Sequence, residues 1–207
     1  NSALTPWMYS KIKKGDIRSM RKVLQLLSIV VVGIAVALML ISPELVLIFG
    51  SPKYREAVYV IPPVAASVFF VFIYNILSMP QFYYEKTQFL MAASMAAAGA
   101  NVVLNFIFIR LFGYIAAGYT TLACYMLYSV GHYIVSKRIL VNEGIRENLM
   151  SPGFLVAFSA FLIGASIICN LIFPYRILRY AILLASAGLV FWKKELLLKT
   201  MADIRKK

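Results

Sequence analysis

Two long apolar segments separated by only three residues constrain this chain more than any other feature. They lie in the stretch QFLMAASMAAAGANVVLNFIFIRLFGYIAAGYTTLACYMLY, which runs from Gln88 to Tyr128. At about 1.5 Å of rise per residue, residues 88–111 form about 36 Å of helix, enough to cross a hydrocarbon core of about 30 Å. Residues 114–135 carry no formal charge and are long enough to cross back. The short connection predicts a tight antiparallel pair of helices in a membrane.

The composition of the chain agrees with a membrane domain. Hydrophobic residues make up 62% of the 207 residues, whereas soluble domains have about 45–50%. Such a chain has too little polar surface to cover a soluble globule. Cys124 and Cys169 lie inside apolar segments, so neither a disulfide framework nor a metal site is predicted. We find no nucleophile motif, phosphate loop or cofactor motif, so an enzyme is not expected.

Six apolar segments predict an all-α fold, a polytopic transmembrane bundle of about six helices. They are residues 23–42, 58–79, 88–111, 114–135, 154–173 and 177–192. The sixth segment is short and contains Arg179. Pro62 and Pro63 are expected in the first turns of the second segment, where a missing amide donor costs little. Pro80 is expected to end that segment.

Basic residues predict the orientation of the bundle. With six crossings, one side of the membrane holds residues 11–22, Lys86, the loop 136–151 and the tail 193–207, which together contain most of the Lys and Arg. Basic loops stay in the cytoplasm, so both ends of the chain are expected there. This topology explains the net charge of +13 without nucleic acid as a partner.

The positions of the apolar segments and the basic residues divide the chain into three parts. Residues 1–22 are expected to form a cytoplasmic connector and the end of a preceding helix. Residues 23–192 are expected to form the membrane lobe, and residues 193–207 a basic tail that either lies on the anionic inner leaflet or is solvated. The chain opens without an initiator methionine, so we expect it to be the C-terminal portion of a longer protein.

Three amides are the best candidates for a binding cavity. Asn101 and Asn105 lie four residues apart on one helix face near mid-membrane, and Asn75 lies in the second segment. An amide that faced lipid would leave its donors and acceptors unpaired, so we expect these side chains in protein or in a wet cavity. Amides can bind sugar hydroxyls without bringing charge into the membrane. They serve equally well as contacts between helices.

Charged candidates are predicted nearer to the membrane surfaces. Arg110, Arg176 and Arg179 are expected near the outer surface, where they either bind a diphosphate or extend from helix ends toward water. Lys86 is expected at the inner mouth, in the same role or as an interface anchor. His132, near the cytoplasmic end, is either a proton relay or a packed side chain. All eight acidic residues lie in loops or flanks of the predicted segments.

Three stretches, in matching order, carry a family resemblance. They are LTPWMYSKIKKGD (Leu4–Asp16), ISPELVLIFGSPKYREAVYVIPP (Ile41–Pro63) and ANVVLNFIFIRLFGYIAAGYTTL (Ala100–Leu122). The first is similar to the cytoplasmic connector of the polysaccharide transporters in the MATE-like flippase superfamily. The second resembles that family's Pro-Glu, apolar helix, Phe-Gly and following Tyr. The third resembles its paired asparagines and the glycine turn after them, so the resemblance covers residues 4–135.

This resemblance implies a transporter with two lobes that rocks around a midplane cavity. The present chain would be the C-terminal lobe, with the N-terminal lobe of the same protein as its partner. The implied substrate is a polyprenyl-diphosphate-linked oligosaccharide, turned between leaflets of the bacterial cytoplasmic membrane for polysaccharide biosynthesis. The cavity candidates are then Asn75, Asn101, Asn105, Arg110 and Lys86.

Two other functions remain open at this point. A drug or cation exporter of the same superfamily would have the same lobe architecture. A membrane enzyme of polysaccharide assembly would need catalytic acids or a polar cluster in an outer loop, and the predicted outer loops are very short. Membrane lipids are expected as partners in every case.

Overall fold

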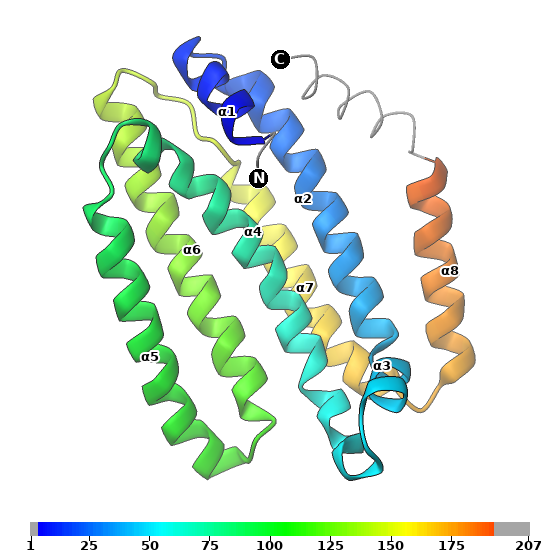
Figure 1. Cartoon of the computed structure of the whole chain (residues 1–207). Coiled ribbons are helices and arrows are strands. Elements are labelled where there is room, and N and C mark those ends of the chain that lie inside the picture. Colours follow the sequence, from blue (N-terminus) through cyan, green and yellow to red (C-terminus); the bar gives the residue numbers. More distant parts are fainter. Residues whose placement is uncertain (1–3, 193–207) are drawn as a thin grey trace.

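The structure is a bundle of helices arranged around one long central helix, α4 (Figure 1). The computed structural model describes residues 4–192, and every regular element in that range is helical. The elements are α1 (Leu4–Lys13), α2 (Ile17–Leu40), α3 (Ser42–Phe49), the 3-10 helix η1 (Pro52–Tyr59), α4 (Ile61–Tyr83), α5 (Gln88–Phe112), α6 (Ala116–Asn142), α7 (Pro152–Ile172) and α8 (Arg176–Trp192). The predicted all-α class is confirmed for these residues.

Four of the described helices are long and apolar enough to cross a membrane, namely α2, α4, α5 and α7. The six longest helices run alternately up and down the bundle, so α8 returns toward the end where α1 lies (Figure 1). α8 has 17 residues, whereas α6 has 27 and includes Lys137 and Arg138 near its end. The architecture is therefore a helical bundle with four candidate membrane spans, plus two further helices parallel to them.

Local sequence explains several helix ends. Asp16 caps α2 by accepting a hydrogen bond from the backbone nitrogen of Ser19 at 3.3 Å. Gly113 ends α5 with a φ of 76°, a conformation that glycine adopts readily. Pro62 and Pro63 lie in the first turn of α4, as predicted. The prediction that Pro80 ends this helix is wrong, because only one backbone bond is lost there and α4 continues to Tyr83.

Other helix boundaries differ from the predicted ones at charged residues. α2 begins at Ile17 rather than at residue 23, and part of the predicted connector is the separate helix α1. α6 continues to Asn142, so the first part of the predicted loop 136–151 is helical. Charged side chains at helix ends reach water through their long apolar stems, so a charge alone does not end a helix. The predicted basic tail, residues 193–207, lies outside the described residues.

The core of the bundle forms along α4. This helix packs against α2, α6 and α7 and contributes a row of buried apolar side chains. The row includes Phe69, Phe70, Ile73, Ile76 and Leu77. In contrast, α5 packs mainly against α6 and contains no fully buried residue. α5 is therefore the least covered of the long helices, whereas α6 is held between α5 and α4.

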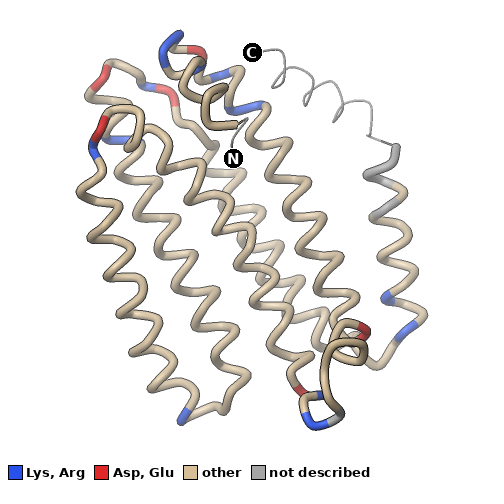
Figure 2. Tube along the Cα trace, viewed as in Figure 1, with Lys and Arg blue, Asp and Glu red and all other residues tan. Residues whose placement is uncertain are grey.

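Charged residues lie at the two ends of the bundle, and the helix middles between them contain very few (Figure 2). We call one end the α1 end; it contains α1, the α4–α5 turn and the α6–α7 loop. The other is the α3 end, with α3, η1, the α5–α6 turn and the α7–α8 turn (Figure 1). Among the described residues, the α1 end holds most of the basic side chains. They are Lys11, Lys13, Lys14, Arg18, Arg21, Lys22, Lys86, Lys137, Arg138 and Arg146.

Candidate functional site

A polar groove between α5 and α6 is the best candidate for a binding site. Its volume is about 450 Å³, and one residue of α4, Tyr74, also lines it. The polar lining residues are Tyr74, Ser94, Asn101, Thr121, Tyr125 and Tyr128. No Lys, Arg, Asp or Glu of the described part of the chain lines this groove. It is an uncharged polar surface inside an otherwise apolar bundle.

Three tyrosines form one wall of the groove. The rings of Tyr74 and Tyr125 lie nearly parallel, with centroids 6.2 Å apart, and the Tyr74 and Tyr128 centroids are 4.7 Å apart. The hydroxyl of Tyr128 shares a hydrogen bond of 2.7 Å with Ser94 Oγ on α5. This bond joins α5 to α6 across the groove. The wall offers ring faces for stacking and hydroxyls for hydrogen bonding.

His132 closes the groove wall toward the α1 end. The side chain is fully buried, and its ring packs at right angles to Tyr128 with centroids 4.5 Å apart. Gln81 of α4 donates from its amide nitrogen to His132 Nδ1 at 2.7 Å, and Phe89 of α5 packs on the same ring. Contacts from three helices thus hold His132 in place. Its position agrees with the packed role, and it packs against the ring of Tyr128 on the side of the α1 end.

Asn101 and Asn105 have different places in the structure. Asn101 lines the groove, and its side-chain oxygen accepts a hydrogen bond of 2.9 Å from Asn105 Nδ2. The oxygen of Asn105 accepts in turn from Thr120 Oγ1 on α6 at 2.5 Å. Asn105 therefore connects α5 to α6, which is the helix-contact role. Its bond also fixes the orientation of the Asn101 amide at the groove.

The other three predicted site residues lie away from the groove. Asn75 donates to the backbone oxygen of Val71 in its own helix at 2.7 Å. Arg110 lies over the ring of Phe106 at the α3 end, 3.8 Å from its centroid. Lys86 lies at the α1 end, where its ammonium group is 3.2 Å from a carboxylate oxygen of Glu143. Of the five predicted residues, only Asn101 and Asn105 lie in contact with each other, and Asn101 alone lines the groove.

The groove tyrosines were not predicted from the sequence, although the sequence of α6 contains a signal for them. Thr121, Tyr125, Tyr128 and His132 follow one another at spacings of four, three and four residues. These spacings place four polar or aromatic side chains on one face of a helix. Tyr74 lies on a different helix and carries no such signal, since its partners are distant in the sequence.

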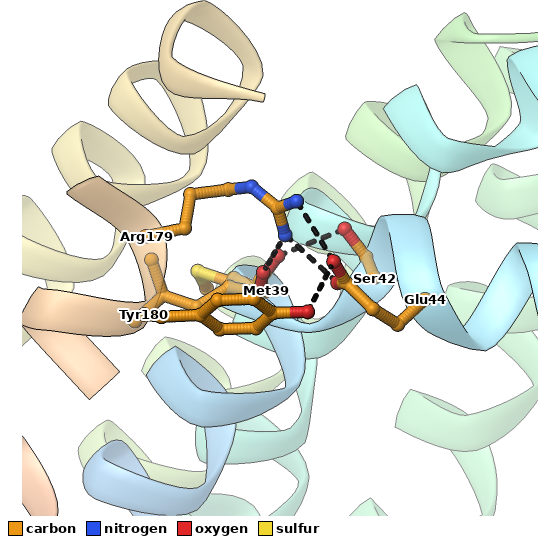
Figure 3. A network of polar contacts seen from close by, with 6 residues as sticks. Met39, Ser42, Glu44, Arg179 and Tyr180 are labelled. Carbon is orange, nitrogen blue, oxygen red and sulfur yellow. Dashed lines mark hydrogen bonds and ion pairs between the residues drawn. The ribbon is translucent and has the colours of Figure 1, made fainter. Parts of the chain in front are cut away.

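A second polar cluster lies at the α3 end, where α8 meets α2 and α3 (Figure 3). Arg179 donates to both carboxylate oxygens of Glu44, at 2.8 Å each, and to the backbone oxygen of Leu40 at 2.6 Å. Tyr180 donates its hydroxyl to Glu44 at 2.9 Å, and Ser42 donates to the backbone oxygen of Met39 at 2.8 Å. The cluster connects three helices.

These contacts correct the prediction for Arg179. Its side chain is 4% exposed, so it neither extends to water nor remains available for a diphosphate. Glu44 belongs to a short helix outside the candidate spans, and the hydrogen bond from Arg179 lowers the pKa of its carboxyl group to about 2. The pair therefore stays ionised at neutral pH and holds α8 against the end of α2.

The space between α4, α6 and α7 is lined mainly by apolar side chains. A cavity of about 190 Å³ lies between α4, α6 and α7, with walls that include Phe69, Ile73 and Leu155. Within residues 4–192 no group of three His, Cys, Asp or Glu side chains is placed to hold a metal ion. The polar groove between α5 and α6 is therefore the site with the most binding chemistry.

That chemistry consists of ring faces, hydroxyls and one oriented amide, without a Lys, Arg, Asp or Glu among the described lining residues. Such a surface can stack against the flat apolar face of a ring and hydrogen-bond the groups at the ring's edge. It can also attract a cation to the tyrosine faces. No protein-family model, curated protein or solved structure matches this chain, so the groove is interpreted from its own residues.

Proposed function

We propose that this chain is the C-terminal lobe of a membrane transporter that flips a polyprenyl-diphosphate-linked oligosaccharide between leaflets by alternating access. In this proposal α2, α4, α5, α6, α7 and α8 all cross the bacterial cytoplasmic membrane, and both ends of the chain are cytoplasmic. The observation that carries the proposal is the uncharged groove lined by Tyr74, Tyr125, Tyr128 and Asn101.

The groove chemistry suits a sugar. A pyranose ring has apolar C–H faces that pack on aromatic rings and hydroxyl groups at its edge that pair with amides and phenols. Tyr74 and Tyr128 supply ring faces, and Asn101 supplies a donor and an acceptor. Because none of these groups is charged, sugar can enter and leave without the desolvation cost of an ion.

The position of the groove suits a transport pathway. Polar side chains are costly in a bilayer unless they face protein or a water-filled cavity. α5 contains no fully buried residue, and the groove beside it is open. In the proposed transporter the N-terminal lobe lies across this open side, and rocking of the two lobes exposes the groove to each leaflet in turn.

The three tyrosines also favour a second function, the export of an organic cation. Aromatic faces attract cations by about 0.5–2 kcal/mol, depending on desolvation. The absence of a carboxylate among the described lining residues makes this the weaker candidate, because a desolvated cation without a counter-charge is expensive. The same variants can test both functions.

The test compares transport by the intact wild-type protein with transport by the variants Tyr128→Leu and Tyr119→Leu. Tyr119 lies on α6 like Tyr128, but it lines a separate apolar cavity with Phe108 and Phe112. In proteoliposomes, Tyr128→Leu should slow the appearance of a fluorescent lipid-linked oligosaccharide in the opposite leaflet by about tenfold, equivalent to about 1.4 kcal/mol. Tyr119→Leu should leave the rate within about twofold of the wild type.

Uptake of tetraphenylphosphonium by the same vesicles measures the second function. Cation transport that depends on Tyr128, without oligosaccharide movement, would establish the exporter instead. Oligosaccharide flipping that is equally fast in wild type and Tyr128→Leu would remove the groove from the pathway.

A further inference from the structure

An open cavity of about 330 Å³ lies at the α3 end, separate from the polar groove, and unlike the groove it is lined by charged residues. It is formed by α3, η1, the end of α7 and the start of α8. Two arginines, Arg55 of η1 and Arg176 of α8, line it together with Glu44 and several apolar side chains. Arg55 and Arg176 belong to segments far apart in the sequence, so only the fold brings the two residues to one cavity.

The charge of this cavity is positive. Neither Arg55 nor Arg176 forms an ion pair with any side chain in the described part of the protein. The carboxylate of Glu44 is already held by both terminal nitrogens of Arg179 and by the Tyr180 hydroxyl. Its charge is therefore balanced within the α3–α8 cluster (Figure 3), and the two lining arginines are left to attract an anion.

The rest of the cavity wall is apolar. Val46 and Leu47 of α3 and Phe173 after α7 line it beside the arginines. α3 continues with Ile48 and Phe49, whose side chains are 71% and 84% exposed. A short apolar helix with such exposed side chains at the end of a membrane bundle suits the region between headgroups and acyl chains. A ligand here would meet both arginine and apolar side chains.

We propose that this cavity, which we call the α3-end cavity, binds the phosphate-bearing head of a lipid between Arg55 and Arg176. The guanidinium groups donate hydrogen bonds to phosphate oxygens, and the first part of the lipid chain lies along Val46 and Leu47. The chemistry is shared by two sources, a resident anionic phospholipid and the diphosphate of a polyprenyl carrier. The carrier as the source rests on the proposed function, whereas the cavity itself does not.

The test measures binding of radiolabelled geranylgeranyl diphosphate to the intact protein in phosphatidylcholine nanodiscs. Arg55→Gln and Arg176→Gln should each weaken binding by about tenfold, because each removes a charged donor from the phosphate. Lys53→Gln is the matched control, since it removes the same charge two residues earlier in η1 and Lys53 does not line the cavity. It should change binding by less than about twofold.

Competitors then distinguish the sources. If phosphatidylglycerol displaces the radiolabelled lipid as effectively as unlabelled geranylgeranyl diphosphate does, the cavity binds a resident phospholipid. Displacement by the diphosphate lipid alone assigns it to the carrier. Equal displacement by inorganic diphosphate would overturn the proposal of a lipid site, because the apolar wall would then contribute nothing.

The proposal also fails if Lys53→Gln weakens binding as much as Arg55→Gln, since general positive charge would then explain the binding. This result is independent of the transport result. If flipping depends on Tyr128 but both arginine variants bind the lipid as the wild type does, the lipid site is wrong and the proposed function stands. If binding depends on the arginines but the protein moves no oligosaccharide, the proposed function is wrong and the lipid site stands.

Discussion

Arg179 in the first turn of α8 and Glu44 on α3 form a two-pronged ion pair, with both nitrogen–oxygen distances at 2.8 Å (Figure 3). The two residues are 135 positions apart in the sequence. The same guanidinium group donates to the backbone oxygen of Leu40 at the end of α2. One side chain therefore satisfies a free carbonyl group at a helix end and holds the last described helix against the bundle.

Removal of either partner should destabilise the bundle. Glu44→Gln leaves a nearly buried guanidinium without its counter-charge, and a loss of about 3–5 kcal/mol is typical when a buried pair is broken in this way. Arg179→Gln should have a smaller effect, because Glu44 is 25% exposed and can be partly hydrated. Thermal unfolding in detergent measures both variants. Arg176→Gln, three residues earlier and exposed, should change stability by less than about 0.5 kcal/mol.

The ion pair should also make the docking of α8 depend on pH at the acidic extreme. The pKa of Glu44 is lowered from 4.5 to about 2 in the folded protein, so its contribution is fully present above pH 4.5. It is lost as the pH falls from about 4.5 to about 2, when the carboxylate is protonated. Proteolysis of the α7–α8 turn at stepped pH values, with an acid-stable protease, measures this loss. If Glu44→Gln shows the same dependence on pH as the wild type, another group is responsible.

Gly118 allows α6 to approach the start of α4 closely. A Cβ atom at this position would lie 2.8 Å from Pro63 Cγ and 2.9 Å from the backbone oxygen of Val60. Gly118→Ala should therefore destabilise the α4–α6 contact by about 1–3 kcal/mol, the usual cost of overpacking. Gly99 on α5 has no atom within 4 Å of its Cβ position, so Gly99→Ala is the control and should not lower the melting temperature.

Alanine variants of Asn101 and Asn105 should distinguish a substrate-binding role from a helix-packing role. Asn105→Ala removes the acceptor of Thr120 and should cost about 0.6 kcal/mol of stability, the average for a hydrogen bond between membrane helices. Asn101→Ala should lower flipping of lipid-linked oligosaccharide severalfold, because its amide lines the groove. Parallel transport and melting measurements give the comparison. A transport defect confined to Asn105→Ala would reverse these assignments.

The proposed orientation can be checked with single cysteines. Lys14→Cys and Glu143→Cys at the α1 end should react with a membrane-impermeant maleimide only after the cells are opened. Lys53→Cys and Tyr175→Cys at the α3 end should react in intact cells. The native Cys124 and Cys169 are buried, but Cys124 also lines the groove, so labelling of the wild-type protein measures the background. Reaction of Lys199→Cys in intact cells would contradict a crossing by α8.

Much of the helix pattern could be predicted from local sequence. The α5–α6 turn at Gly113 and the position of Pro62 in the first turn of α4 follow from backbone preferences of single residues. The prediction failed at Pro80 and along residues 136–142. A proline and a charged stretch often mark the end of a helix, but α4 and α6 continue through them. There, burial of the adjacent residues Gln81, Ser136 and Ile139 against the bundle outweighs the local preference.

The sequence by itself determined that this chain forms long apolar helices with charged ends, because length, hydropathy and charge placement are properties of adjacent residues. It also indicated Asn101 as a groove residue, through the cost of an amide in lipid. Only the tertiary structure decided that Arg179 is bound to Glu44 and that Arg55 and Arg176 line one cavity. It likewise brought Tyr74 against Tyr125 and Tyr128. Partners on different helices are chosen by packing of the whole bundle, which no local pattern encodes.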